Sequence, residues 1–503
     1  MKEPDKFYIR TISPIHVGSD EVYEPTGFTI DEKECRMVVF DPFLFVSRLS
    51  DEAKQEFSKI CTKGTIPSNL EIYKFLAGKT VQGRYVEVCR GVLDQYRQTL
   101  GMSLNNENLI RQELNRFEIP RTAFRSIDQL PYIPGSAIKG ALRTAYLNQK
   151  EAEKQLSKRG KERNAKKLEQ QLMDYDDIPT DPFRMVKVSD FSPVGAAKTR
   201  IVYAINQKKK PTGRDARGIP LIFEIIAPGT LFQGTIVVDT PQPGAGIKKP
   251  VSLPEILKSA SAFYGKERHR ECGELKRMGI VPSSFEEPPE EHAVTIRIGR
   301  HSGAESVTIE GHRNIHIMEG KGKKGHNEDH ATTVWLVSES RKALAMNNLA
   351  PFGWAQLSQM TDDLAQQFQI REQEWQAKRD ESHSTQRAKT ERQTELKRQD
   401  AEVAKRKAME EEERRKEEAR EMAEFDAMTP EERDLVTLAD PGITEQQVFD
   451  IFGRIGGFSE ENKKLAAMAT KTYWKQHDRW NKKDCSKKQW TKVQRIKEML
   501  GDL

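Results

Sequence analysis

Long runs of apolar residues are missing from this sequence of 503 residues. A membrane-spanning helix needs roughly 18 or more consecutive apolar residues, and the longest candidate, Ile219–Pro228, is interrupted by Glu224. The first ten residues, MKEPDKFYIR, contain no apolar core of the kind found in signal peptides. We therefore expect neither a membrane-spanning nor a secreted protein.

Cysteine is also scarce, and its spacing shows no pattern. The five cysteines are scattered, odd in number and never spaced as Cys-x-x-Cys. Such a set predicts neither a disulfide framework nor a zinc knuckle, and it is typical of the reducing cytoplasm, where we expect the protein to work. The five are Cys35, Cys61, Cys89, Cys272 and Cys485.

Charge, by contrast, is abundant and unevenly distributed. The chain is 36% hydrophobic and 31% charged, and it is too long for one core, since a single core stops growing near ~250–300 residues. The net charge is +6. Residues 361–428 hold 15 basic and 19 acidic residues, a net charge of −4, and the rest of the chain holds 67 basic and 57 acidic residues, a net charge of +10. Lys471–Lys497 alone holds ten basic and two acidic residues. This excess favours a polyanionic partner, although a surface that only keeps a protein in solution has the same composition.

The order of predicted elements indicates an α+β fold. Residues 1–245 are expected to form one domain with a helical insertion at about 43–118, and residues 246–360 a second, smaller domain. The Pro/Gly-rich run Pro241–Pro250 marks the expected boundary. Strands are predicted at Lys6–Ser13, Gly27–Phe40, Phe183–Asp190, Arg200–Asn206, Ile219–Ile226, Thr230–Asp239, Ala293–Ile298, Ser306–Glu310 and Thr332–Leu336, a helix around Leu253–Gly265, and a hairpin turn at Ala227–Gly229 between the fifth and sixth strands.

Residues 361–428 have the composition of a single charged helix. Half of them (34 of 68) are charged, and none is Gly or Pro. Large apolar residues are too sparse for a coiled-coil seam, and a charged, disordered linker is the alternative. Thr429 and Pro430 are typical of a new helix start, and 429–503 is expected to be a small, basic, all-α module. The favourable acid-first pairs four residues apart are Glu402–Arg406, Glu410–Arg414, Glu411–Arg415 and Glu412–Lys416.

The segment Pro131–Leu147 predicts a loop followed by an amphipathic helix. Ser136 has the residue type and the place of an N-cap. Apolar residues then recur every four positions, which predicts a buried stripe. The stripe consists of Ile138, Leu142 and Tyr146.

Two cations and a glycine occupy the rest of this helix. Lys139 and Arg143 are one turn apart on another face, close to the helix N-terminus, where free N–H groups favour an anion. Gly140 costs a helix about 1 kcal/mol relative to alanine, which suggests that another backbone, such as that of a nucleic acid, approaches there. The alternative is an ordinary helix with two solvated cations and a glycine for tight packing.

This segment resembles the helix motif of the RAMP proteins of CRISPR–Cas systems, and in particular the fifth Csm subunit family of type III-A effector complexes. Nothing comparable covers residues 361–503. Further matches, in the order found in that family, are Thr11–Gly18, Val186–Asp190 and Pro351–Trp354, so that the resemblance extends over residues 1 to about 358.

The resemblance implies two ferredoxin-like (RRM-like) RAMP domains that bind RNA. Proteins of this kind cap the 3′ end of the CRISPR RNA and contribute to its maturation and to complex assembly, but do not cleave the target. The implied partners are CRISPR RNA, the neighbouring backbone RAMP subunit, other effector subunits such as the small helical one, and target RNA. No cofactor and no catalytic residue is implied.

Glycine-rich loops supply further candidates for RNA contact. Gly299–Gly303 and Gly311–Arg313 follow predicted strands, and glycines let a backbone approach phosphates while Arg and His supply charge or stacking. RAMP proteins contact RNA through loops at about this place. The complete set of predicted RNA-binding residues is Ser136, Lys139, Gly140, Arg143, Arg300, His301, Gly303 and Arg313, with Lys208 and Lys209 as weaker additions and Lys321, Lys323 and Lys324 following the loops.

Other chemistry is less well supported by the sequence. His312/His316 and His326/His330 have a spacing that can share a metal on a helix, but nearby glycines argue against a helix, so we expect no metal site. His16 is a candidate general base for metal-independent cleavage of precursor CRISPR RNA, without a visible partner for catalysis. A protein-only scaffold is the third alternative. In the last 75 residues, Trp474, Trp480 and Trp490 are expected to form a small core, and the lysines between them either its solvated face or a nucleic-acid contact.

Overall fold

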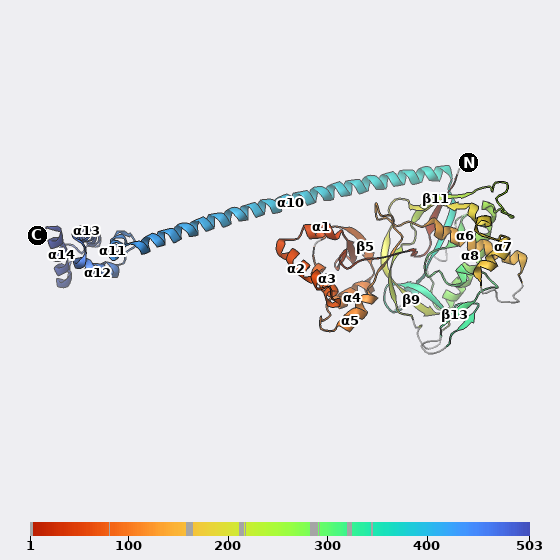
Figure 1. Cartoon of the computed structure of the whole chain (residues 1–503), viewed down its shortest axis with the longest axis horizontal. Helices are drawn as coiled ribbons and strands as arrows, with labels where there is room; N and C mark the ends of the chain where they lie inside the picture. Colours follow the sequence, from red (N-terminus) through yellow and green to blue (C-terminus); the bar gives the residue numbers. More distant parts are fainter. Residues whose placement is uncertain are drawn as a thin grey trace. The chain divides into compact units, whose positions relative to one another are not determined.

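The structure is a computed structural model that describes residues 4–79, 81–156, 164–210, 216, 218–281, 290, 292–318, 324–343 and 346–502. It divides into two compact units, Met1–Glu381 and Ser382–Leu503, whose elements are labelled in Figure 1. Among the helices within those ranges, none has the length and apolar character needed to cross a membrane.

The first sheet of the Met1–Glu381 unit is antiparallel in all its described pairs. Its strand order is β12-β17-β1-β11-β7, and the short strand β8 also pairs with β11. The predicted strand Lys6–Ser13 is confirmed as β1, at the centre of this sheet. The bounds are β1 Asp5–Thr11, β7 Val186–Val188, β8 Ser192–Pro193, β11 Leu231–Val238, β12 Val294–Arg297 and β17 Trp354–Gln359.

The second sheet has the order β16-β15-β9-β5-β4-β3, with β10 also on β9. Strand β5 lies inside the predicted helical insertion 43–118 and pairs with β4 and β9, so this segment is mostly, but not entirely, helical. The strands are β3 Phe28–Asp31, β4 Arg36–Val39, β5 Arg84–Val88, β9 Thr199–Lys208, β10 Leu221–Ile226, β15 Thr333–Ser338 and β16 Ala350–Pro351, and the helices of the insertion are α1 Pro42–Ser47, α2 Asp51–Lys63, α3 Ile66–Leu76, α4 Arg90–Leu100 and α5 Glu107–Arg116.

The predicted hairpin around Ala227–Gly229 is wrong, although both of its strands exist. Strand β10 pairs with β9 in the second sheet, whereas β11 pairs with β1 in the first. The turn therefore passes the chain from one sheet to the other, and it is held by a hydrogen bond from the amide of Gly229 to the carbonyl of Thr11 (2.7 Å). A turn motif indicates that the chain reverses, but it does not tell which strands pair.

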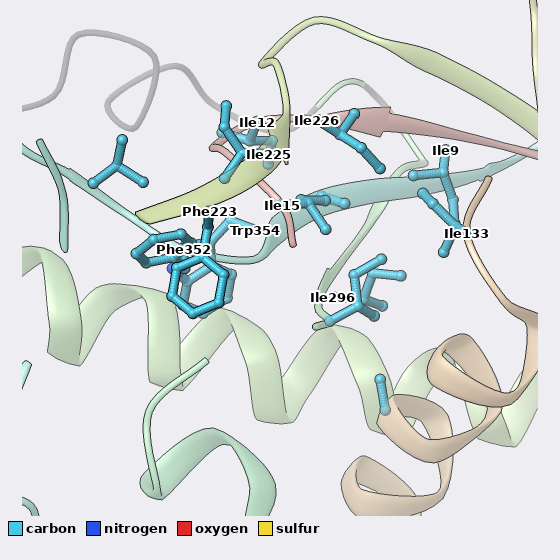
Figure 2. Packing of buried hydrophobic residues seen from close by; sticks show 14 of the residues in the cluster. Ile9, Ile12, Ile15, Ile133, Phe223, Ile225, Ile226, Ile296, Phe352 and Trp354 are labelled. Carbon is cyan, nitrogen blue, oxygen red and sulfur yellow. The ribbon is translucent and has the colours of Figure 1, made fainter. Parts of the chain in front are cut away.

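Residues 1–245 and 246–360 contribute strands to both sheets. The first sheet inserts β1 between β11 and β17, and the second pairs β9 with β15. One hydrophobic core runs through both ranges, and Figure 2 shows Ile9, Ile133 and Phe223 packed in the same cluster as Ile296 and Trp354. The run Pro241–Pro250 therefore does not separate two independent cores.

Two long helices, α6 (Gly135–Lys154) and α8 (Leu253–Arg277), pack against each other and against the first sheet. Helix α8 extends three turns beyond the predicted Leu253–Gly265. The predicted strand Ser306–Glu310 is wrong, because Glu305–Val307 forms a 3₁₀ turn against α6. Smaller elements are α7 Ala165–Met173 and two pairs of strands, β2 Gly18–Val22 with β6 Pro120–Thr122 and β13 Ile315–Ile317 with β14 His326–Glu328.

The predicted charged helix is confirmed as α10, a single helix from Asp362 to Ala427 (Figure 1). Its first turns belong to the Met1–Glu381 unit, where Phe368 is buried against Tyr8. Two of the four predicted ion pairs form, at Glu411–Arg415 and Glu412–Lys416, whereas Arg406 pairs with Glu410 and Arg414 with Glu418, one turn further along the helix.

The Ser382–Leu503 unit ends in four described helices around a core of their own. The predicted helix start at Thr429 is confirmed, with a capping box to Glu432. Trp474 and Trp480 lie in the core and Trp490 packs against it, as predicted. The helices are α11 Pro430–Ala439, α12 Glu445–Arg454, α13 Glu460–Gln476 and α14 Lys487–Leu500.

Candidate nucleic-acid interface

Helix α6 begins two residues earlier than a cap at Ser136 predicts, and Ser136 is not its cap. Pro134 occupies the N-cap position, and the carboxylate of Asp190 accepts a hydrogen bond from the amide of Gly135 (2.8 Å). A side chain at position 135 would clash with the carbonyl oxygens of Val188 and Ser189, so only glycine allows the helix to start this close to the neighbouring strand. The hydroxyl of Ser136 is left on the exposed surface of the first turn.

The exposed side of α6 carries small residues in successive turns. The predicted stripe of Ile138, Leu142 and Tyr146 is buried as expected. Gly140 is exposed, and a side chain there would meet nothing within 4 Å. Because Ser136 lies one turn before Gly140, the backbone of α6 is accessible there to a ligand from outside.

The two predicted cations of α6 differ in their surroundings. Arg143 forms ion pairs with Glu169 (2.6 Å) and Asp181 (2.8 Å), and its side chain is only 21% exposed. Burial by itself would lower the pKa of Arg143, but these carboxylates hold the pKa above its usual value. The charge of Arg143 is therefore already balanced within the protein.

Lys139 is partly exposed and forms no ion pair within the described parts of the chain. Burial lowers the pKa of the Lys139 amine, and the neighbouring Arg143 adds to this effect while Asp181 opposes it. A partly desolvated ammonium next to another cation gains from an anion supplied by a ligand. Of the two cations, Lys139 is the one available to a phosphate.

The loop that follows β12 lies against α6. Asn148 donates a hydrogen bond to the carbonyl of Thr308 (3.2 Å) and accepts one from the amide of Glu310 (2.8 Å). At the start of this loop, Gly299 has a φ of +86°, and a Cβ there would stand 2.5 Å from the carbonyl oxygen of His16. This glycine thus serves the approach of another segment of the same protein, and not that of a phosphate.

Arg300 and His301 occupy different environments in this loop. Arg300 is exposed, with its guanidinium 5.5 Å from the ring of Phe223. The ring of His301 lies between Phe223, Trp335 (4.7 Å) and Phe352 (5.3 Å). Burial, together with the charge of Arg300, lowers the pKa of His301 to about 4, so His301 is neutral at pH 7 and supplies packing instead of charge.

Two further predicted cations belong to a set of buried ion pairs beside α8. Lys209 pairs with Glu305 (2.7 Å) and Glu274 (3.0 Å), Arg313 pairs with Glu267 (2.7 Å), and both cations have side chains only 10% exposed. Although burial opposes it, the cations hold the pKa of Glu305 at about 2. The members of this α8 ion-pair network are Lys209, Arg270, Arg297, Arg313, Glu267, Glu271, Glu274 and Glu305.

The network anchors the loop instead of leaving its cations free. Gly303, with a φ of +77°, lies against Arg297 and Glu305. Sequence reasoning missed the carboxylates, although the spacing of Glu267, Glu271 and Glu274 on one face of a helix was a usable signal. Lys208 is half-buried and Lys324 exposed, and Lys321 and Lys323 lie outside the described residues.

His16 is inside the protein. Its ring is fully buried against Phe223 (4.6 Å), and Nδ1 is 2.7 Å from the carbonyl oxygen of Glu224. Burial lowers the pKa of His16. Neither ring nitrogen is accessible to a 2′-hydroxyl in this conformation, because Nδ1 is engaged and Nε2 is shielded from solvent.

The histidines considered for a metal lie on no common helix. His316 and His326 are on the paired strands β13 and β14, and His312 pairs with Glu151 (3.0 Å). Within the described residues, the one group with metal-ligand proximity is Glu328, Asp329 and His330, consecutive residues of which two are exposed.

The model of the RAMP superfamily matches residues 8–459 of the chain. Because this match covers most of the sequence, the chain belongs to the RAMP superfamily. The α+β architecture, with helices packed on two sheets in which one described pair, β5 with β9, is parallel and the others are antiparallel, agrees with this membership.

Among individual proteins, the chain is similar to those named CRISPR system Cms protein Csm5. It is 26% identical to the protein of Streptococcus thermophilus over 274 residues, which are 52% of this chain and 69% of that protein. It is 27% identical to the protein of Mycobacterium tuberculosis over 158 residues, 28% of this chain and 41% of that protein. Among solved structures, it matches a chain of a Csm–crRNA–target RNA ternary complex (TM-score 0.47, 17% identity, 70% of this chain and 100% of that one) and Csm5 of T. onnurineus (TM-score 0.38, 17% identity, 60% of this chain and 92% of that one).

Proposed function

We propose that this chain is a non-catalytic, RNA-binding subunit of a type III-A CRISPR effector complex, which caps the 3′ end of the CRISPR RNA. Membership of the RAMP superfamily and the similarity to Csm5 proteins support the complex and its partners, CRISPR RNA and neighbouring Csm subunits. Residues 1–245 and 246–360 correspond in this proposal to two ferredoxin-like RAMP halves that share their sheets.

The observation that carries the RNA contact is the exposed side of α6. Ser136 and Gly140 leave the helix backbone accessible, and Lys139 is a cation without a carboxylate partner in the described residues. The positive end of the helix dipole lies at the same turn. Arg300, exposed on the loop that contacts α6 at Asn148, is a second exposed cation of this unit.

The remaining predicted residues then support the RNA contact indirectly, by holding the surrounding elements in place. Arg143, Lys209 and Arg313 are paired with carboxylates, so we assign them to holding α7 and the loop in place. His301 and Gly303 fix the shape of the loop that presents Arg300.

The proposal is tested by retention of CRISPR RNA in a complex assembled with variant chains. Lys139→Ala combined with Arg300→Ala is expected to lower retention of the RNA about tenfold or more, because two phosphate contacts are lost. The remaining binding should also depend less steeply on salt. The matched control replaces two exposed lysines elsewhere in the same unit, Lys166→Ala and Lys258→Ala, and should retain RNA like the wild type. Equal retention by all three chains, each correctly folded, would remove the proposed contact.

The non-catalytic assignment is supported by the burial of His16. Incubation of the purified chain with repeat RNA in EDTA should leave the RNA intact. Specific cleavage that is lost in His16→Ala would instead establish the alternative, a metal-independent RAMP endoribonuclease. A protein-only scaffold, the other alternative, would not depend on RNA, and a salt series of RNA binding would then show no steep slope.

A further inference from the structure

Five exposed lysines surround the junction between α13 and α14, in a part of the chain that the proposed RNA contact does not use. Lys475 lies at the end of α13, two lysines lie in the connecting loop and two in the first turn of α14. The match to the RAMP superfamily model ends at residue 459, before this region. The junction patch consists of Lys475, Lys482, Lys483, Lys487 and Lys488.

The lysines of the junction patch lack the partners that neighbouring cations have. Lys471 pairs with Asp502 (2.5 Å) and Arg479 with Glu445, and Lys492 lies 3.8 Å from the ring centre of Phe449. In the described part of the chain, no ion pair involves the five patch lysines. Their positive charges are therefore available to an external anion.

Between residues 429 and 497, acidic and basic residues lie mostly in separate segments. Residues 429–459 hold two basic and six acidic residues, a net charge of −4, whereas Lys471–Lys497 has ten basic and two acidic ones, a net charge of +8. A surface that serves only solubility mixes both signs. A concentrated single-sign field is typical of a binding surface for the opposite charge.

The start of α14 also runs against helix energetics. Its first turn contains Lys487 and Lys488 and no acid, whereas α11, α12 and α13 all have Glu in their first turns. Cations at a helix N-terminus are disfavoured by the helix dipole. The two lysines therefore do not serve the stability of α14.

The tryptophans of this unit belong to its core. Trp474 is fully buried and Trp480 is 9% exposed, both in the core, and Trp490 packs against that core. Binding of single strands through bases needs exposed aromatic faces. The patch thus offers its lysines to phosphates, whereas the tryptophans serve mainly the core.

We propose that the junction patch binds the sugar-phosphate backbone of a nucleic acid, without sequence preference, as a second contact in addition to the one on α6. The same phosphate chemistry is present in single-stranded RNA and in duplex DNA. An acidic protein surface is the competing partner, and the experiment below distinguishes the three.

The test uses the full chain with Lys482→Glu, Lys483→Glu, Lys487→Glu and Lys488→Glu combined. Because Glu suits the first turn of a helix, this variant should unfold at no lower temperature than the wild type. The control carries the same change of charge at four exposed lysines outside the patch, Lys33→Glu, Lys59→Glu, Lys405→Glu and Lys407→Glu. Affinity for mixed-sequence RNA and for duplex DNA is measured across a salt series, with polyglutamate as competitor.

Loss of four phosphate contacts should reduce the slope of log K against log salt by about 3 for single-stranded RNA or about 4 for duplex DNA. If the slope is reduced with just one of the two probes, the patch is assigned to that nucleic acid. The control should keep the wild-type slope with both probes. Slopes equal to those of the wild type with both probes would overturn the proposal, and loss of polyglutamate binding alone would assign the patch to an acidic protein. The α6 contact is unaffected by this variant, so failure of one proposal is distinguishable from failure of the other.

Discussion

At the scale of single residues, the two glycines of α6 have opposite roles. Gly135 lets the helix start directly against the carbonyl groups of Val188 and Ser189, whereas Gly140 faces open space. The sequence indicated that a glycine in this helix allows a close approach. It did not indicate that the approach inside the protein occurs at Gly135.

Replacing each glycine by alanine separates these roles. Gly135→Ala should destabilise the chain by about 2 kcal/mol or more, because the added methyl group clashes with backbone that cannot move freely. Gly140→Ala should stabilise it by up to ~1 kcal/mol through helix propensity, while lowering RNA retention. Denaturant unfolding measures the stability of both variants, and equal stabilities would contradict the assignment.

His301 gives the stability of the protein a dependence on pH. Its pKa falls from 6.5 to about 4 on folding, so the unfolded chain binds more protons between these values. The contribution is complete above pH 6.5 and is lost as the pH falls toward 4, with an upper limit of about 3 kcal/mol.

The measurement compares unfolding of the wild type and of His301→Asn at pH 7, 6, 5 and 4. Asparagine tolerates the positive φ of 62° at this position and does not titrate. The variant should be less stable at pH 7 and lose less stability on acidification. Parallel pH profiles would show that His301 is not the group responsible.

At the scale of elements, the helices follow from the sequence better than the sheets. The buried stripe of α6, the capped start of α11 and the length of α10 are all local patterns, and they were predicted. Strand pairing depends on residues far apart in sequence. The separation of β10 from β11 into different sheets, and the insertion of β5 between β4 and β9, could therefore not be predicted from turn signals.

The same limit applies to the candidate site. Sequence reasoning selected the cations by residue type, but whether a cation is free depends on carboxylates from other elements. Arg143 finds Glu169 and Asp181, and Lys209 finds Glu305, 96 positions away. Lys139, which meets no such partner within the described ranges, was not distinguishable from Arg143 before the fold was known.

Removing one carboxylate from the α8 ion-pair network should strongly destabilise the protein. Glu305→Gln leaves Lys209 and Arg270 under-compensated in a buried place and should cost roughly 3–5 kcal/mol. The matched control, Glu310→Gln, removes an exposed ion pair with Lys266 and should cost less than ~1 kcal/mol. Thermal and denaturant unfolding measure the difference, and similar costs for the two variants would show that the network is not structurally important.

At the scale of the whole molecule, two units with separate cores carry separate positive surfaces. The Met1–Glu381 unit presents Lys139 and Arg300, and the Ser382–Leu503 unit presents the junction patch. Both surfaces lie outside the −4 segment 361–428. The acidic excess of the sequence thus lies in helix α10, which belongs to both units, whereas the positive surfaces lie in the rest of each unit.

The central claim is that α6 meets CRISPR RNA. It is tested most directly by ultraviolet cross-linking of the assembled complex, followed by mapping of the cross-linked peptides and of the position on the RNA. We predict cross-links from the 3′ region of the CRISPR RNA to the segment Gly135–Lys154 and to the loop containing Arg300. Cross-links confined to other segments of the chain, or none at all in a complex that retains its RNA, would contradict the claim.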